Sequence, residues 1–133
     1  MFKHFFVFLL LMLMLPISAS AHSPLASLSP EDGASLDQTP PQMEMVFKSP
    51  AKLIKVEMLK LNANSNGSLL GSLFGGSEGD EVSLGKDFLM KVAETHAIAL
   101  PQLTIGNYAV AWRAMGEDGH VIKGDFSFKV TGN

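Results

Sequence analysis

Hydrophobic residues alternate with polar or small residues along much of this chain, a pattern typical of strands with one buried face. The clearest alternation lies near the C-terminus, over residues 108–113 and again over residues 126–130. A polar connection containing Gly116 and Gly119 joins these two segments. The pattern therefore predicts a β-hairpin, or a longer link between two strands, over residues 108–130.

The rest of the chain shows shorter segments of the same kind, separated by turn residues. We expect strands within residues 25–28, 43–47 and 54–61, and two further short strands within 82–100. Ser49-Pro50 is expected to end one strand, and the Asn-, Ser- and Gly-rich residues 62–85 to form a long loop. About seven strands and no convincing amphipathic helix predict an all-β fold, an immunoglobulin-like β-sandwich or Greek-key barrel.

The first 21 residues have the features of a secretory signal peptide. A basic start is followed by a short apolar run, and the small residues Ala19 and Ala21 occupy the −3 and −1 positions of a cleavage site. The alternative is a retained membrane anchor, but the apolar run is short for a membrane span and Pro16 interrupts it. We therefore expect cleavage after Ala21, export to the periplasm, and one mature domain over residues 22–133.

The composition limits which partners and ligands are expected. The formal net charge is −3 with no basic block, which argues against nucleic acid as a partner. The sequence contains no cysteine. Disulfides and thiolate metal sites are therefore excluded, and any metal would be held by imidazole, amine, carboxylate or thioether groups.

Asp118 and His120 are candidate metal ligands because they stand two residues apart in the predicted hairpin. In an extended segment such residues point to the same side. Cleavage after Ala21 would add His22 as the first residue, with a free α-amine and an imidazole Nδ1 that together form a chelate. Two alternatives stay open from the residues alone: Asp118-Gly119 as a plain turn, and His22 as an incidental residue after a cleavage site.

Several segments together resemble the CopC-like periplasmic copper-binding proteins. They are the signal ending before His22, the turn at residues 29–34, the strand at 43–47, residues 106–113 with Asp118-Gly119-His120, and residues 124–128. The middle of the chain, residues 62–95, departs from the family pattern. The resemblance implies a β-sandwich that binds Cu(II) through His22, Asp118 and His120, and a partner in the inner membrane such as a copper-import protein.

The donor set agrees with that implication. Three nitrogens and one oxygen make a tetragonal set that suits Cu(II). The methionines at positions 43, 45, 58 and 90 fall on strand patterns and are expected in the core, and the loop 62–85 contains neither Met nor His. No Cu(I) site is therefore expected. His96 is expected to be an exposed or core-edge residue, while Arg113 and Glu117 are either partners of the ligands or part of a solvated face.

The sequence thus predicts a monomeric, non-enzymatic protein that holds one Cu(II) ion. Its expected role is copper homeostasis, copper resistance or delivery to an inner-membrane copper transporter of the CopD type, without a polysaccharide partner. One alternative is a copper-dependent oxidative enzyme with an N-terminal histidine brace. Another is a metal-free β-sandwich with an adhesion or chaperone-like role.

Overall fold

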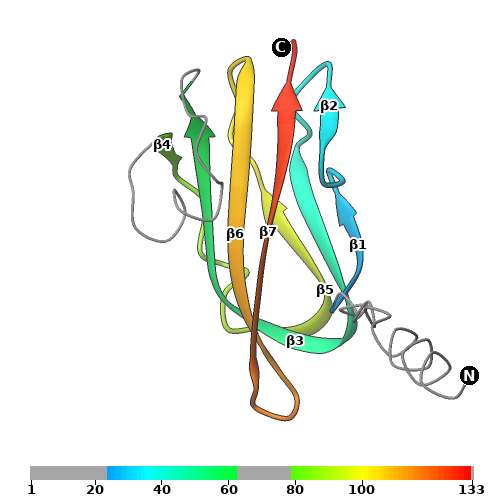
Figure 1. Cartoon of the computed structure of the whole chain (residues 1–133). Coiled ribbons are helices and arrows are strands. Elements are labelled where there is room, and N and C mark those ends of the chain that lie inside the picture. Colours follow the sequence, from blue (N-terminus) through cyan, green and yellow to red (C-terminus); the bar gives the residue numbers. More distant parts are fainter. Residues whose placement is uncertain (1–23, 63–78, 133) are drawn as a thin grey trace, which may run out of the picture.

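The computed structural model describes residues 24–62 and 79–132 of the chain (Figure 1). These residues form seven strands and no helix, which confirms the predicted all-β class. The strands are β1 (Leu25–Ser29), β2 (Ala34–Leu36), β3 (Gln42–Leu61), β4 (Gly79–Val82), β5 (Val92–Ala99), β6 (Gly106–Gly116) and β7 (Val121–Val130). In this described part, no helix is long and apolar enough to span a bilayer.

The long strand β3 connects the two layers of the fold. Its first half pairs with β1 and β5, and its second half pairs with β4 and β6, all in antiparallel fashion. The register of the β3–β5 pair shifts between Val46 and Ala51, so the strand bends around Ser49-Pro50. The sheet curls over at this bend, and Figure 1 shows β3 turning sharply there.

The sheet closes through β6, β7 and the short strand β2. β6 and β7 form the predicted antiparallel hairpin, with Trp112 opposite Gly124. β2 then pairs with β7 in parallel, so β1 and β2 lie in different parts of the sheet although only a few residues connect them. A strand pair that changes layer in this way is typical of Greek-key sandwiches and barrels.

The core is apolar and contains several aromatic side chains in contact. Trp112 packs edge to face on Phe47 with 5.4 Å between ring centroids, and Tyr108 stacks on Phe128 at 5.6 Å. The Tyr108 hydroxyl donates a 2.7 Å hydrogen bond to the carbonyl of Thr104, four residues upstream. This contact resembles the tyrosine corner of immunoglobulin-like sandwiches, and it satisfies the only polar atom of a side chain that is otherwise buried.

The structure corrects several expectations about individual strands. Ser49-Pro50 bends β3 without ending it, because the bulge absorbs the proline between paired segments. Strand β4 lies inside the region expected to be a loop, and β2 was not expected at all. Both strands are short, at four and three residues, too short for a clear alternating pattern.

Met90 was expected in the core, and that prediction is wrong. Residues 86–90 form a turn before β5, Met90 has a φ of 65°, and its side chain is 62% exposed. The apparent alternation of Phe88, Met90 and Val92 therefore crosses a turn, and Phe88 is the member that is buried. By contrast, the core expectation is confirmed for Met43, Met45 and Met58, which are fully buried.

Candidate metal centre

A tight turn between β6 and β7 brings Asp118 and His120 together. The amide of Gly119 donates to the Gly116 carbonyl at 3.0 Å, and the amide of Gly116 donates to the His120 carbonyl at 3.0 Å. Gly119 has a φ of 82°, a conformation that glycine adopts without steric cost. Asp118 and His120 therefore lie in a turn and not in the extended strand expected from their spacing.

The turn places the two functional groups in direct contact. His120 Nδ1 lies 2.8 Å from Asp118 Oδ2, and the backbone amide of His120 donates to Asp118 Oδ1 at 3.0 Å. A carboxylate accepts only, so the contact at Oδ2 requires a proton on Nδ1, and Nε2 points away from this bond. Both side chains are exposed, at 84% for His120 and 68% for Asp118. The pair is thus preformed and reachable from solvent.

This contact also sets the protonation of the two side chains. The hydrogen bond from the His120 side chain, followed by that from its backbone amide, lowers the pKa of Asp118. The hydrogen bond and the nearby charge of Asp118 raise the pKa of His120 above its ordinary value. The pair therefore contributes stability below the ordinary histidine pKa, and that contribution is lost as the pH rises through the raised pKa. Since the pair is solvated, the contribution is small.

We expect an NMR titration of the metal-free protein to show this coupling. The His120 imidazole should titrate above the ordinary histidine value of about 6.5, and Asp118→Asn should move its midpoint back toward that value. An Asp87→Asn variant, which changes another exposed turn carboxylate, should leave the His120 midpoint in place. An unchanged midpoint in Asp118→Asn would contradict the coupling.

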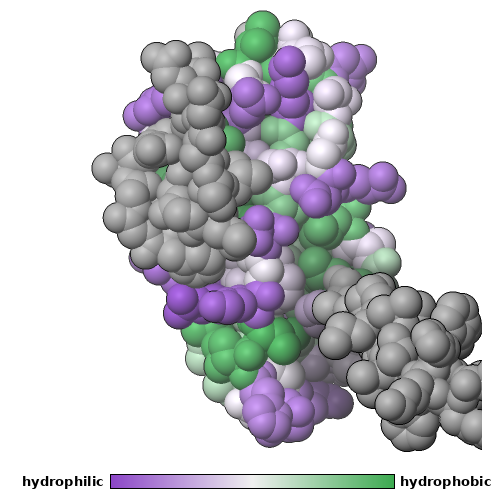
Figure 2. Space-filling view, in the orientation of Figure 1, coloured by the Kyte–Doolittle hydropathy of each residue, from purple (hydrophilic) through white to green (hydrophobic). Residues whose placement is uncertain are grey.

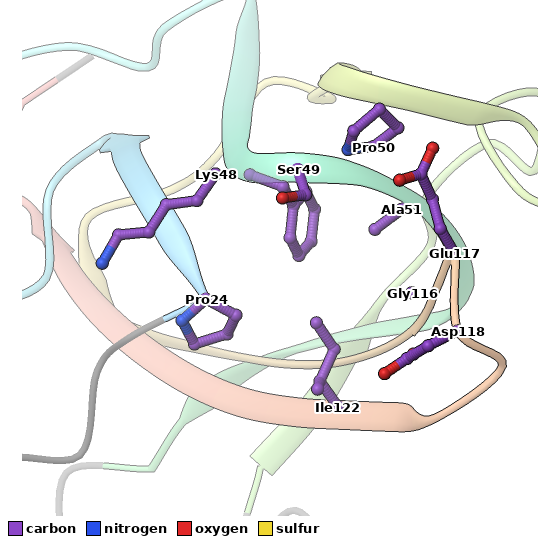
Figure 3. A pocket seen from close by; sticks show the side chains of 10 residues that line it. Pro24, Lys48, Ser49, Pro50, Ala51, Gly116, Glu117, Asp118 and Ile122 are labelled. Atoms are coloured by element: carbon purple, nitrogen blue, oxygen red, sulfur yellow. The ribbon is translucent and has the colours of Figure 1, made fainter.

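A hollow of about 330 Å³ opens beside the turn, at the end of the barrel where β3 bends (Figure 3). Pro24 and Lys48 line one side of it, and Glu117 and Asp118 line the other, with the Asp118 carboxylate directed toward the opening. The amide of Lys48 donates to the Pro24 carbonyl at 3.0 Å. Pro24, the first described residue, is therefore held against the β3 bend, in the same hollow as Asp118.

His22 and the predicted cleavage site lie outside the described residues. His22 stands two residues before Pro24, and two residues of extended chain span at most about 7 Å. Within residues 24–62 and 79–132, no group of three or more His, Asp or Glu side chains is arranged to hold a metal. Asp118 and His120 are thus brought together, whereas the third expected ligand, His22, lies outside the described residues.

His96 is a structural residue of the core edge, as one of the two expectations had it. It is 4% exposed, and its Nε2 lies 2.9 Å from the Ala51 carbonyl and 3.0 Å from the Ala93 carbonyl. Because carbonyls only accept, this nitrogen carries the proton and donates to both. The bonds satisfy carbonyls beside the interruption in the β3–β5 register, and they occupy one of the two ring nitrogens of His96.

The remaining side chains near the turn are mostly solvated. Glu117 is exposed and lines the hollow. Arg113 is exposed on the outer face of β6, opposite Lys55 and Lys123. The hollow itself was not expected from the sequence. Ser49-Pro50 was the one sequence feature that pointed to the hollow, because it predicts a break in the strand. It does not predict on which side of the barrel the bend leaves a hollow.

Comparison with known families decides which kind of protein this is. The family model described as the CopC domain matches residues 25–131. The chain belongs to the CopC domain family. This match includes the turn that carries Asp118 and His120 and almost all described residues, so the resemblance expected from the sequence is confirmed.

Solved structures of this family share the fold. CopC from Methylosinus trichosporium OB3b is 20% identical, with a TM-score of 0.57 over 84% of this chain and 96% of its own. PcoC from Escherichia coli, described as a methionine-rich copper resistance protein, is 22% identical, with a TM-score of 0.57 over 84% of this chain and all of its own. A search of curated protein sequences found no match.

Proposed function

We propose that this CopC-family protein is a periplasmic carrier of one Cu(II) ion. The ligands would be the α-amine and imidazole of His22, a carboxylate oxygen of Asp118 and the imidazole of His120. The observation that carries the proposal is the preformed contact between Asp118 and His120 at the end of the barrel. Copper as the cargo is supported by family membership and by the description of PcoC as a copper resistance protein.

The spacing of the Asp118–His120 pair fits a tetragonal copper site. Two ligands at right angles, each about 2.0 Å from a metal, lie about 2.8 Å from each other. The observed separation of Asp118 Oδ2 and His120 Nδ1 is 2.8 Å. Copper bound by both atoms would displace the proton on Nδ1 and would lie to one side of the line between them, so the imidazole would have to turn its nitrogen lone pair from the carboxylate toward the ion. This supports neighbouring positions for the two groups in one coordination plane.

The position of Pro24 supports His22 as the remaining ligand. Pro24 lines the hollow that Asp118 also lines, and the backbone contact with Lys48 holds it there. Proline has no amide proton, so the third residue of the processed chain cannot supply a deprotonated amide nitrogen as a ligand. The N-terminal chelate would then need ligands from elsewhere in the fold, and the β6–β7 turn is the neighbouring source.

The exposure of the pair favours carriage over catalysis. A carrier must give up its ion, and solvated ligands on a turn are accessible to an acceptor protein. A carboxylate ligand also stabilises Cu(II) and fills a position that an oxidative copper enzyme would keep open. We therefore propose a role in copper homeostasis or resistance, as a monomer that exchanges copper with an inner-membrane transporter of the CopD type.

Alanine substitutions in the turn test the site. His120→Ala and Asp118→Ala should each weaken Cu(II) binding by about tenfold or more, since each removes a ligand. Asp87→Ala is the matched control, because it removes an exposed carboxylate from a different turn, and it should bind copper as the unmodified protein does. Isothermal titration against a competing chelator gives the affinities. Unchanged binding in both turn variants would place the site elsewhere.

The preference for Cu(II) over Cu(I) is a separate expectation. Thioethers are the soft ligands that Cu(I) selects, and Met43, Met45 and Met58 are fully buried. A Cu(I) competition titration should therefore show much weaker binding than for Cu(II). Tight Cu(I) binding that is lost in Met90→Leu or Met115→Leu would contradict the expectation, since those two side chains are more accessible.

A further inference from the structure

The five methionines within the described residues differ sharply in their access to solvent. Met43, Met45 and Met58 are 0% exposed and belong to the core. Met115, near the end of β6, is partly buried. Met90 is 62% exposed, in the turn that precedes β5. Among these five thioethers, Met90 is therefore the one that a small molecule in solution reaches most easily.

The backbone holds Met90 in a conformation that methionine rarely adopts. Its φ of 65° lies in the left-handed region, which is unfavourable for a residue with a large side chain. The amide of Met90 donates to the Leu53 carbonyl at 2.9 Å, and the amide of Leu89 donates to the Lys86 carbonyl at 3.0 Å. The position of Met90 is therefore fixed by backbone hydrogen bonds on both sides of the turn.

Stability does not explain a methionine at this position. Glycine or asparagine would suit the positive φ better, and an exposed thioether lacks the burial that stabilises the core methionines. An unfavourable backbone conformation that carries an exposed reactive group suggests a role for that group. In methionine the reactive group is the sulfur, which oxidants convert to a sulfoxide.

Few other groups in the described residues compete for an oxidant. The sequence contains no cysteine, and Trp112 is 3% exposed. The large apolar side chains that are exposed are Met90, Val92, Ile105 and Val121, and Figure 2 shows hydrophobic surface near the lower end of the barrel. Three of these four are hydrocarbons without an oxidisable heteroatom. Met90 thus combines exposure with a reactive sulfur.

We propose that Met90 is a reversible oxidation site for hydrogen peroxide. Its sulfur attacks one peroxide oxygen, so an S–O bond forms and the O–O bond breaks. The sulfur loses two electrons, and the proton of the transferred oxygen passes to the departing hydroxide, which leaves as water. A methionine sulfoxide reductase reverses the change, since two thiols become a disulfide and the oxygen leaves as water. This chemistry does not depend on the proposed copper site.

The fold tolerates oxidation at Met90 but not at the core methionines. The sulfoxide is polar, and at a side chain that is 62% exposed it stays in contact with water. The same group at Met43, Met45 or Met58 would be buried among apolar side chains without a hydrogen-bond donor. The exposed turn also leaves the sulfoxide open to a reductase. Met90 is therefore oxidised and restored while the domain stays folded.

The test treats the copper-free, processed protein with hydrogen peroxide in the presence of a metal chelator. Peptide mass spectrometry follows each methionine separately. Met90 should be oxidised first, Met115 more slowly, and the three core methionines at least about tenfold more slowly than Met90. The singly oxidised protein should unfold at nearly the same temperature as the unmodified protein. Methionine sulfoxide reductases A and B, which each reduce one epimer, should together restore its mass.

Three variants provide the controls. Met90→Leu should abolish the first oxidation step, whereas Met115→Leu should leave that step unchanged. Met90→Asn should also abolish it, and asparagine suits the positive φ, so misfolding would not account for the loss. Thermal unfolding of each variant before peroxide treatment checks that the domain is folded.

Several results would overturn the proposal. Equal oxidation rates for all five methionines, or a fastest step at Met115, would mean that exposure of Met90 does not direct the reaction. A fast step that persists in Met90→Leu would assign the oxidation to another side chain. A clearly lower unfolding temperature of the singly oxidised protein would show that the fold does not tolerate the sulfoxide. Failure of both reductases to restore the mass would exclude reversibility.

Discussion

A protein that retains one residue before His22 is expected to bind Cu(II) roughly a hundredfold more weakly, or worse, than the processed form. The extra residue converts the α-amine of His22 into an amide, which is a very poor ligand unless it is deprotonated. The chelate ring between the amine and Nδ1 is lost, and the His22 imidazole remains as a single ligand. Retention of Ala21 creates this variant with the natural sequence.

The fold should be unaffected by this extension, because additions at chain ends are usually tolerated. Thermal unfolding of the metal-free protein should therefore be the same with and without Ala21. One extra residue after Asn133 is the matched control and should change neither unfolding nor copper affinity. His22→Ala should lose more affinity than the extension, since its imidazole is removed as well. Equal copper affinity in the extended and processed forms would rule out the N-terminal chelate.

Substitution of Gly124 by alanine is expected to destabilise the protein by about 2 kcal/mol or more. A Cβ at this position would lie 2.6 Å from Trp112 Cζ2 and 2.8 Å from Cε2. The indole is buried and packs edge to face on Phe47, so it cannot move aside without disturbing the core. For a domain of this size the midpoint of thermal unfolding should fall by on the order of 10 °C.

Gly85→Ala is the matched control, because the same atom added there meets nothing within 4 Å. It should leave the unfolding midpoint nearly unchanged. A double variant, Gly124→Ala with Trp112→Leu, tests whether the steric contact between the added methyl group and the indole causes the destabilisation. Its destabilisation should be smaller than the sum of the two single changes, because the smaller side chain makes room for the methyl group. Additive effects would mean that the steric contact with the indole is not the cause.

The strands with long alternating patterns could be predicted from the sequence, whereas the short ones could not. Residues 108–113 and 126–130 alternate, and these two segments lie within β6 and β7. β2 and β4 are formed by pairing with β7 and β3, a tertiary effect that leaves little local signal. The turn at residues 86–90 imitated an alternating strand, which led to the wrong expectation for Met90.

The candidate site shows a similar division. Spacing alone suggested that Asp118 and His120 face the same side, and they do meet, although a turn and not an extended strand brings them together. The burial of His96 depends on the interruption of the β3–β5 register. The sequence pattern around His96 gives no sign of this interruption. The hollow at Pro24 and Asp118 depends on the β3 bend meeting the hairpin tip, and this is likewise visible only in three dimensions.

The rival functions differ in what copper does once bound. An oxidative enzyme with a histidine brace would consume peroxide and a reductant in the presence of bound copper, whereas a carrier would not turn over. A metal-free adhesion or chaperone-like sandwich would show no copper spectrum at all. Peroxide consumption by the copper-loaded protein, compared with the His120→Ala variant, separates the first of these from the proposed carrier.

We propose that the processed protein holds a single Cu(II) ion through His22, Asp118 and His120. Titration of the protein beginning at His22 with Cu(II), followed by electron paramagnetic resonance, tests it most directly. We predict one copper per chain with a tetragonal, nitrogen-dominated spectrum that changes in His22→Ala, Asp118→Ala and His120→Ala. A spectrum identical in all four proteins, or no spectrum from protein-bound copper, would contradict the claim.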